Sequence, residues 1–234
     1  MKIEVWSDYV CPFCHIGKRQ LEKAIKSSGY EGQIDVEFKS FLLGPTTPID
    51  AQDSIYTALS RKYNMSEQEA KNMTANVTAR AKEVGLDYNF DDMKTANTTA
   101  AHRLAKLAAA QGKAEIYNER LMKAYFLEGE AIGRHDVLKR LAKEAELDME
   151  AVQHVLESNE YEEAVNQDIY EAQQIGVRGV PFFVFNNKYG LSGAQPRPLF
   201  EQTIEQAASE AGLKKQIKVI GQDGAICSDG QCEV

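Results

Sequence analysis

Two cysteines near the amino terminus have the spacing of a thiol–disulfide exchange centre. The segment Cys11-Pro12-Phe13-Cys14 follows an alternating stretch that predicts a strand (residues 2–6) and leads into a stretch with helical periodicity. At such a turn, the amide groups at the start of the helix favour an anion at the first sulfur. Because the thiolate is the attacking species in disulfide exchange, the pattern predicts Cys11 as nucleophile and Cys14 as resolving thiol.

A second pair of cysteines, Cys227 and Cys232, lies at the other end of the chain. The intervening Asp229-Gly230 is typical of a tight turn that can bring the two sulfurs together. We expect an auxiliary redox pair, with two alternatives left open. The pair is a tail feature without function, or both pairs form a four-thiolate zinc site, which would occupy the nucleophile.

The residue after the first pair, His15, completes the Cys-x-x-Cys-His pattern of covalent haem attachment. That function requires an exported protein and usually a second axial ligand to the haem iron. Nothing in the sequence indicates export, so this interpretation is disfavoured and the sequence predicts no cofactor.

Composition limits the possible partners and location of this 234-residue chain. Its formal net charge of −8 at pH 7 argues against nucleic acid as a partner. No apolar run reaches the length of a membrane span. Glu4 and Asp8 stand where a signal peptide would carry its apolar core, so we expect a cytoplasmic protein that binds no membrane.

The order of predicted elements indicates an α/β fold with an insertion. Strands at 2–6 and 34–38 flank the first helix, and an apolar run at 182–185 is followed by an Asn186-Asn187 turn and a second strand at 188–191. A closing helix is expected at 198–211 and one more strand at 217–220.

The intervening part of the chain, from about 50 to 175, reads as helical almost throughout. Ser66 and Glu69 form a capping-box signature at the start of one of its helices. We therefore predict one sheet domain from residues 1–44 and 176–220, a helical insertion domain at 45–175 and a cysteine-containing tail at 221–234.

Four short segments, taken together and in the order in which they occur along the chain, make the predicted fold more specific. They are residues 8–17 (DYVCPFCHIG), 97–104 (NTTAAHRL), 179–185 (GVPFFVF) and 192–196 (SGAQP). Together they resemble the DsbA family of thioredoxin-fold oxidoreductases, and within it the FrnE-like cytoplasmic branch, over about residues 2–212. His102 in the second segment lies on an alanine-rich helix, where we expect it to pack or to cap.

The resemblance implies a thioredoxin fold interrupted by an all-helical domain. It implies a protein-disulfide oxidoreductase or isomerase whose redox-active centre is Cys11 and Cys14, with Pro181 in the cis form facing the dithiol. The Val180 backbone is then expected to pair with an extended segment of a client protein, and Pro12 and Phe13 to contact the client. Glutathione or another small thiol is a further expected partner.

The sequence departs from the family at Phe13, where strongly oxidising DsbA enzymes carry histidine. Phenylalanine offers the thiolate neither charge nor a hydrogen bond, so the resemblance predicts a reduction potential below the DsbA value of about −120 mV. In a reducing cytosol this favours reduction or isomerisation of clients over net oxidation.

Two other functions stay open on the sequence. Kappa-type glutathione transferases and hydroxychromene-carboxylate isomerases resemble the chain in architecture, but they carry serine or a similar residue at the position of Cys11. Alternatively, the helical insertion presents an apolar groove, and the protein is a holdase-like chaperone in which the redox pair is secondary.

Overall fold

The computed structural model describes residues 1–216, 226–228 and 231–233. Its main sheet has the strand order β2–β1–β3–β4, with bounds β1 (Lys2–Ser7), β2 (Asp35–Ser40), β3 (Phe182–Phe185) and β4 (Tyr189–Ser192). Strand β1 pairs with β2 in parallel and with β3 antiparallel, and β3 pairs antiparallel with β4. The central strands therefore come from opposite ends of the chain, as the β–α–β and hairpin prediction requires.

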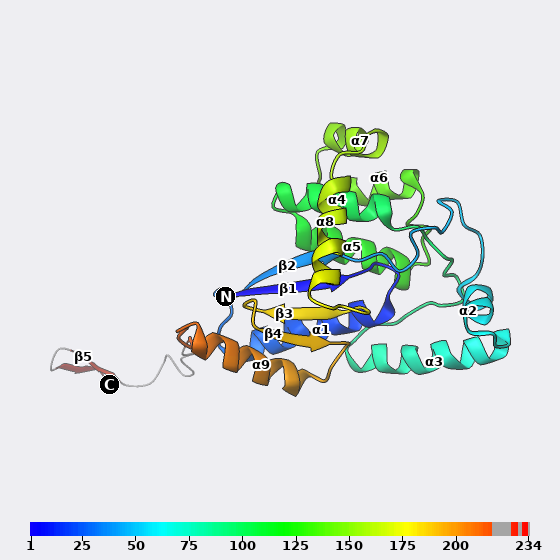
Figure 1. Ribbon diagram of the computed structural model, residues 1–234. Helices are drawn as coiled ribbons and strands as arrows, with labels where there is room; N and C mark the ends of the chain where they lie inside the picture. Colours follow the sequence, from blue (N-terminus) through cyan, green and yellow to red (C-terminus); the bar gives the residue numbers. More distant parts are fainter. Residues whose placement is uncertain (217–225, 229–230, 234) are drawn as a thin grey trace.

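Alternation along the strands sends apolar side chains to both faces of the sheet. On one face Ile3, Val5 and Phe183 pack with Leu21 of α1 (Pro12–Ser28) and Phe200 of α9 (Arg197–Glu210). The opposite face carries a smaller cluster around Trp6 and is covered by α8 (Glu162–Gln174). The sheet thus lies between two layers of helix (Figure 1).

Local sequence signals are confirmed at two places. Asn186 and Asn187 both have positive φ, 51° and 55°, as a two-residue turn between antiparallel strands requires. The Ser66 hydroxyl accepts a hydrogen bond from the Glu69 amide, and the Glu69 carboxylate accepts one from the Ser66 amide, so the capping box begins α3 (Glu67–Glu83).

The prediction of nearly continuous helix from 50 to 175 is wrong in two stretches. Residues 50–54 and 84–98 contain no helix, and they run antiparallel where they meet. There Ser54 and Lys94 form an isolated bridge, with the amide of Ile55 donating to Met93 and that of Thr95 donating to Asp53. The remaining helices are α2 (Ile55–Tyr63), α4 (Thr99–Ala110), α5 (Ala114–Phe126), α6 (His135–Glu144) and α7 (Met149–Glu157).

The helical segment and the cysteine turn share one hydrophobic core. Tyr9, Cys11, Cys14 and Ile16 belong to the same buried cluster as the apolar faces of α4, α5, α6 and α7. The helical segment therefore shares its core with the cysteine turn, whereas the sheet with α1 and α9 has a core of its own.

Near the carboxyl terminus, β5 (Ile226–Ser228) and β6 (Gln231–Glu233) form an antiparallel pair. The strand predicted at 217–220 and the Asp229-Gly230 turn lie outside the described residues. Among the helices that are described, none combines the length and the apolar character needed to cross a membrane.

Candidate active site

The first cysteine lies at the amino end of α1. Cys11 is the N-cap residue, with extended backbone angles of φ −95° and ψ 108°, and Pro12 follows in the first turn. The Cys11 amide donates to the Asp8 carbonyl at 3.1 Å, and the Cys14 amide donates to the Cys11 carbonyl at 3.0 Å. This is the strand–turn–helix geometry that the spacing predicts, and it places Cys11 at the positive end of the α1 dipole.

The loop before β3 completes the site from the far end of the chain. The Val180–Pro181 peptide bond is cis, as the resemblance implies. The Cys11 thiol donates to the Val180 carbonyl, with 3.5 Å between Sγ and O. The Gly193 amide donates to the Pro181 carbonyl at 2.8 Å, which ties this loop to the end of β4.

The two cysteines differ little in their exposure to solvent. Cys11 is 4% exposed and Cys14 is 2% exposed, so both are buried. Helix α3 contributes to the covering, since the guanidinium of Arg80 lies 5.1 Å from the centre of the Phe13 ring and donates to the Ala194 carbonyl at 3.4 Å. Helix α3 and the Phe13 ring thus lie together beside the cysteine turn.

Electrostatics distinguishes Cys14 instead. Burial raises the pKa of the Cys14 thiol well above its ordinary value, and the neighbouring Cys11 raises it further. The Ser7 hydroxyl and the Asp8 backbone act in the opposite direction without outweighing the burial. Cys14 therefore holds its proton at neutral pH, which suits a thiol that acts second.

A buried carboxylate holds the turn against the helical segment. Asp8 is fully buried, and its carboxylate accepts hydrogen bonds from the Leu43 amide at 2.7 Å and pairs with His102 Nε2 at 3.3 Å. The expectation that His102 packs or caps did not include this pairing with the Asp8 carboxylate. Both residues lie in the conspicuous segments 8–17 and 97–104, but nothing in a single sequence pairs them.

His15 is also buried, beside the stacked rings of Tyr88 and Phe126. Burial lowers its pKa to about 3, so the imidazole is neutral under ordinary conditions. The phenol of Tyr88 donates to the Pro12 carbonyl at 2.8 Å, which fixes this aromatic group beside the first turn of α1.

The structure thus brings together Cys11, Pro12, Phe13, Cys14, Val180 and Pro181 from the two predicted segments. It places Cys227 in β5 opposite Cys232 in β6, in a two-stranded sheet separate from the main one.

Known proteins resemble this chain in sequence and in fold. A solved structure of a probable DsbA oxidoreductase from Streptomyces coelicolor has 35% sequence identity and a TM-score of 0.85, covering 100% of this chain and 99% of that one. The Bacillus subtilis protein YwbO is 30% identical over 204 residues, which are 86% of this chain and 94% of YwbO.

A cytosolic disulfide reductase, DsbM from Pseudomonas aeruginosa, solved with glutathione, has the same fold at 16% identity. Its TM-score is 0.63, with 89% of this chain and 100% of that chain covered. The family description of the DSBA-like thioredoxin domain matches residues 2–205. On this match and on the identity to its relatives, the chain belongs to the DSBA-like thioredoxin domain family.

Proposed function

We propose that the protein is a protein thiol–disulfide oxidoreductase, with Cys11 as nucleophile and Cys14 as resolving thiol. The observation that carries the proposal is the position of Cys11, at the amino end of α1 and in contact with the Val180 carbonyl next to Pro181. Membership of the DSBA-like family supports the same class of reaction.

In the reducing direction, the Cys11 thiolate attacks one sulfur of a client disulfide and releases the other as a thiolate. Cys14 then attacks Cys11 Sγ, breaks the mixed disulfide and releases the second client sulfur. Two electrons pass from the dithiol to the client, and the protein is left with a Cys11–Cys14 disulfide. If the released client thiolate instead attacks a different client disulfide, the outcome is isomerisation.

Client binding is assigned to the residues around the thiol. An extended client segment pairs with the Val180 backbone, and Pro181 keeps that loop against the dithiol. This mode of recognition gives affinity through main-chain hydrogen bonds and little choice of sequence, which suits an enzyme with many clients. The half-buried ring of Phe13, with Pro12 beside it, supplies an apolar contact.

Regeneration of the dithiol requires an external reductant. Glutathione is the proposed small thiol, and the solved DsbM complex shows it bound to a protein of this fold. We place the protein in the cytosol, where the glutathione pool is reducing enough to keep such dithiols reduced. Reduction and isomerisation are then the favoured directions.

The tail pair is proposed as an auxiliary dithiol. Support comes from the antiparallel register that sets Cys227 opposite Cys232. We expect this pair to exchange with Cys11 and Cys14 or with clients, and to change the rate of turnover without being required for it.

The test is reduction of insulin and refolding of scrambled ribonuclease by the full chain. Cys11→Ser is expected to abolish both activities, whereas the double variant Cys227→Ser, Cys232→Ser retains the first step. Full activity of Cys11→Ser would rule out the mechanism, and aggregation suppression without any redox activity would favour a chaperone.

A further inference from the structure

Strand β2 has a partner strand along one side only. In the described part of the chain it stands at the edge of the main sheet, with β1 as its one neighbour. The amide of Asp35 donates to the Met1 carbonyl at 2.8 Å, so Asp35 turns its backbone groups toward β1. Because this direction alternates along a strand, the N–H and C=O groups of Val36 and Phe38 point away from β1.

The open part of this edge ends at Ser40. The Ser40 amide, which also points away from β1, donates to the buried carboxylate of Asp168 at 2.7 Å. Val36 and Phe38 have no such backbone partner among the described residues. Their two N–H and two C=O groups therefore form a template for one extended segment of about three to five residues.

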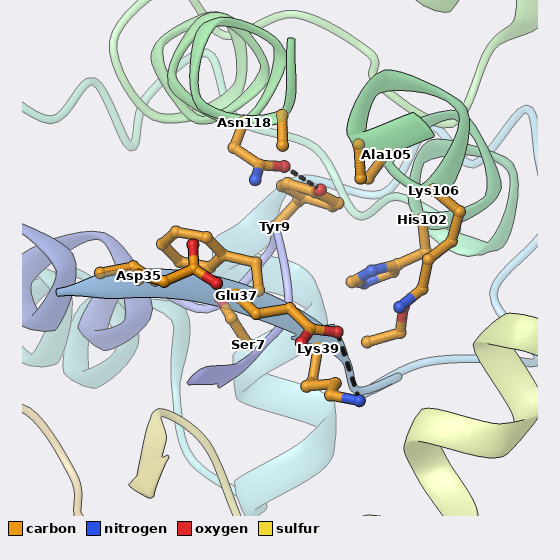
Figure 2. Close-up of a pocket in the computed structure, with 14 residues that line it drawn as sticks. Ser7, Tyr9, Asp35, Glu37, Lys39, His102, Ala105, Lys106 and Asn118 are labelled. Carbon is orange, nitrogen blue, oxygen red and sulfur yellow. Dashed lines mark hydrogen bonds and ion pairs between the residues drawn. The ribbon is translucent and has the colours of Figure 1, made fainter. Parts of the chain in front are cut away.

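A cavity of about 340 Å³ follows this edge, and all six residues of β2 line it. Figure 2 shows β2 on one side of it and, on the other, the helices α4 and α5, which carry Ala105 and Asn118. Its volume is in the range of ligand pockets, about 300–1,000 Å³.

A second cavity, of about 370 Å³, lies on the α1 side of the same edge. Val36 and Phe38 line both cavities, and both side chains are half-buried. The apolar residues that complete the second cavity are Leu21, Ile25 and Ile34. Side chains of a segment paired with β2 would alternate between the two faces of the sheet, so every second one would enter this apolar cavity. The β2 edge and the two cavities together form one groove, the edge groove.

Unpaired carboxylates border the edge groove. Within the described residues, Glu31, Asp35 and Glu115 line it and form no salt bridge. The lysines that line it are paired with carboxylates, with the exception of Lys26. The surplus of negative charge favours a partner with basic side chains.

The edge groove runs toward the redox centre. Strands β1 and β2 are parallel, with Ser7 opposite Ser40, and the cysteine turn follows β1 directly. Tyr9, two residues before Cys11, lines the cavity along β2. A polypeptide held along β2 therefore has one end at the same end of the sheet as the cysteine turn.

We propose that the edge groove binds an extended segment of a client protein in which apolar residues alternate with lysine or arginine. The segment adds a strand to the sheet through hydrogen bonds with the backbone of Val36 and Phe38. Its apolar side chains enter the cavity beside α1, and its basic side chains lie near the unpaired carboxylates. The identity of the occupant as a client rests on the function proposed above.

The probe is a fluorescein-labelled, cysteine-free hexapeptide of alternating valine and lysine, titrated into the full chain and followed by fluorescence anisotropy. Amide exchange in deuterium oxide, followed by NMR, locates the bound peptide. Exchange at Val36 and Phe38 is expected to slow about tenfold or more, with no change at Asp35 and Glu37, whose amides already face β1. Slow exchange at Val36 and Phe38 in the free chain would overturn the proposal, because the edge would already be paired.

N-methylation of the peptide tests backbone pairing without altering the protein. One peptide carries methyl groups on the valine amides and a second on the lysine amides, so each loses the donors along one side of the strand. One of the two is expected to bind about tenfold more weakly and the other within about twofold of the parent peptide. Equal effects would refute strand addition.

Val36→Pro removes one outward N–H and leaves the hydrogen bonds to β1 intact, since the Val36 amide does not face β1. It is expected to weaken binding about threefold to tenfold. Val36→Thr, which keeps the amide and the branched shape, is the matched control and should bind like the wild type.

Asp35→Lys tests the charge of the edge groove and is expected to weaken binding about threefold to fivefold. Glu163→Lys makes the same change of sign at an exposed position of α8 and should leave the affinity unchanged. Equal weakening in both variants would show that net charge, and not the edge groove, attracts the peptide.

Competition identifies the occupant. The peptide is expected to raise the KM for insulin reduction in proportion to its concentration, and to leave kcat and the reaction with dithionitrobenzoate unchanged. Binding without this competition would overturn the client assignment. So would tighter binding in Val219→Asp, which would assign the edge to the chain's own apolar segment 217–220, or a dimer that Val36→Pro dissociates, which would assign it to a second copy.

Failure of the proposed function gives a different result. Insulin reduction would then survive Cys11→Ser, whereas binding of the cysteine-free peptide does not depend on either thiol.

Discussion

At the residue scale, His15 is a buried polar group whose stability cost can be measured. It follows Cys14 directly, is fully buried, and neither ring nitrogen has a hydrogen-bond partner among the described residues. Its neighbours are the aromatic rings of Tyr88 and Phe126, which offer no strong acceptor. Burying an unpartnered polar group costs free energy of folding.

His15→Leu is therefore expected to raise the free energy of unfolding at pH 7 by about 1–3 kcal/mol. The folded-state pKa of about 3 lies below the ordinary value of 6.5, so the unfolded chain binds a proton first on acidification. The wild type should lose stability as pH falls below about 6.5 toward 3, and His15→Leu should lack this component. Urea unfolding at several pH values measures both effects.

The same substitution at exposed His154 serves as control and should change stability by less than about 0.5 kcal/mol. A His15→Leu variant less stable than wild type at pH 7 would mean that the imidazole has a partner after all.

Gly17 sets how closely α1 approaches the Pro181 loop. A Cβ atom at this position would lie 2.9 Å from Phe183 Cζ and 3.2 Å from Pro181 Cγ. Phe183 is fully buried, so it cannot move away without disturbing the sheet core. We expect Gly17→Ala to destabilise the fold by about 1–2 kcal/mol despite alanine's better helix propensity.

Thermal unfolding measures this change, and Gly179→Ala provides the control on the other side of the site. A Cβ atom at Gly179 meets nothing within 4 Å, and its backbone is not left-handed. Equal stability of Gly17→Ala and wild type would show that α1 has room to move away from the loop.

At the scale of elements, one carboxylate joins the helix that carries the cysteines to the helical insertion. Glu119 of α5 forms ion pairs with Lys18 and Arg19 of α1. Burial alone would raise the pKa of Glu119, but the hydrogen bonds and positive charges of these two residues lower it to about 2. The two ion pairs of Glu119 therefore stabilise the packing of α5 against α1 at neutral pH.

Glu119→Gln is expected to lower the free energy of unfolding at pH 7 by about 1 kcal/mol, a value reduced for the solvent screening of a side chain that is one-third exposed. Because the folded pKa is depressed, this contribution is present above about pH 4.5 and disappears as pH falls toward 2. Urea unfolding of wild type and variant should therefore converge in acid.

Glu115→Gln, an exposed position on the same helix, is the matched control and should follow the wild-type curve. A constant difference between Glu119→Gln and wild type at all pH values would point to packing and not to charge.

Sequence patterns predicted the elements whose signals are local. The Ser66 capping box, the Asn186-Asn187 turn and the helix start at Pro12 depend on residues a few positions apart, and all three form as expected. The resemblance supplied the fold and the cis form of Pro181, because its motifs lie in a fixed order along the chain.

Contacts between distant segments could not be predicted in this way. The Asp8–His102 pair and the covering of Phe13 by Arg80 join residues far apart in the sequence. The antiparallel contact between residues 50–54 and 84–98 could not be predicted for the same reason, since hydrogen bonds between these two distant segments fix its path. The near-equal burial of Cys11 and Cys14 likewise follows from the packing of the insertion on the cysteine turn.

At the scale of the whole molecule, the redox couple must match its surroundings. Phe13 lies against the Arg80 guanidinium and provides no hydrogen bond to Cys11, so the Cys11–Cys14 couple should be less oxidising than DsbA. We expect a reduction potential below about −120 mV, measured by equilibration with glutathione. Phe13→His is expected to raise it, and an unchanged value would remove Phe13 from the explanation.

The most direct test of the account is to trap the mixed disulfide. In a chain whose tail cysteines are serine, Cys14→Ser is mixed with a client protein, quenched with acid and analysed by intact mass and peptide mapping. The account predicts that a covalent client adduct accumulates through Cys11 and is absent from Cys11→Ser. No adduct in Cys14→Ser, or an equal amount in Cys11→Ser, would contradict the assignment of Cys11 as the attacking sulfur.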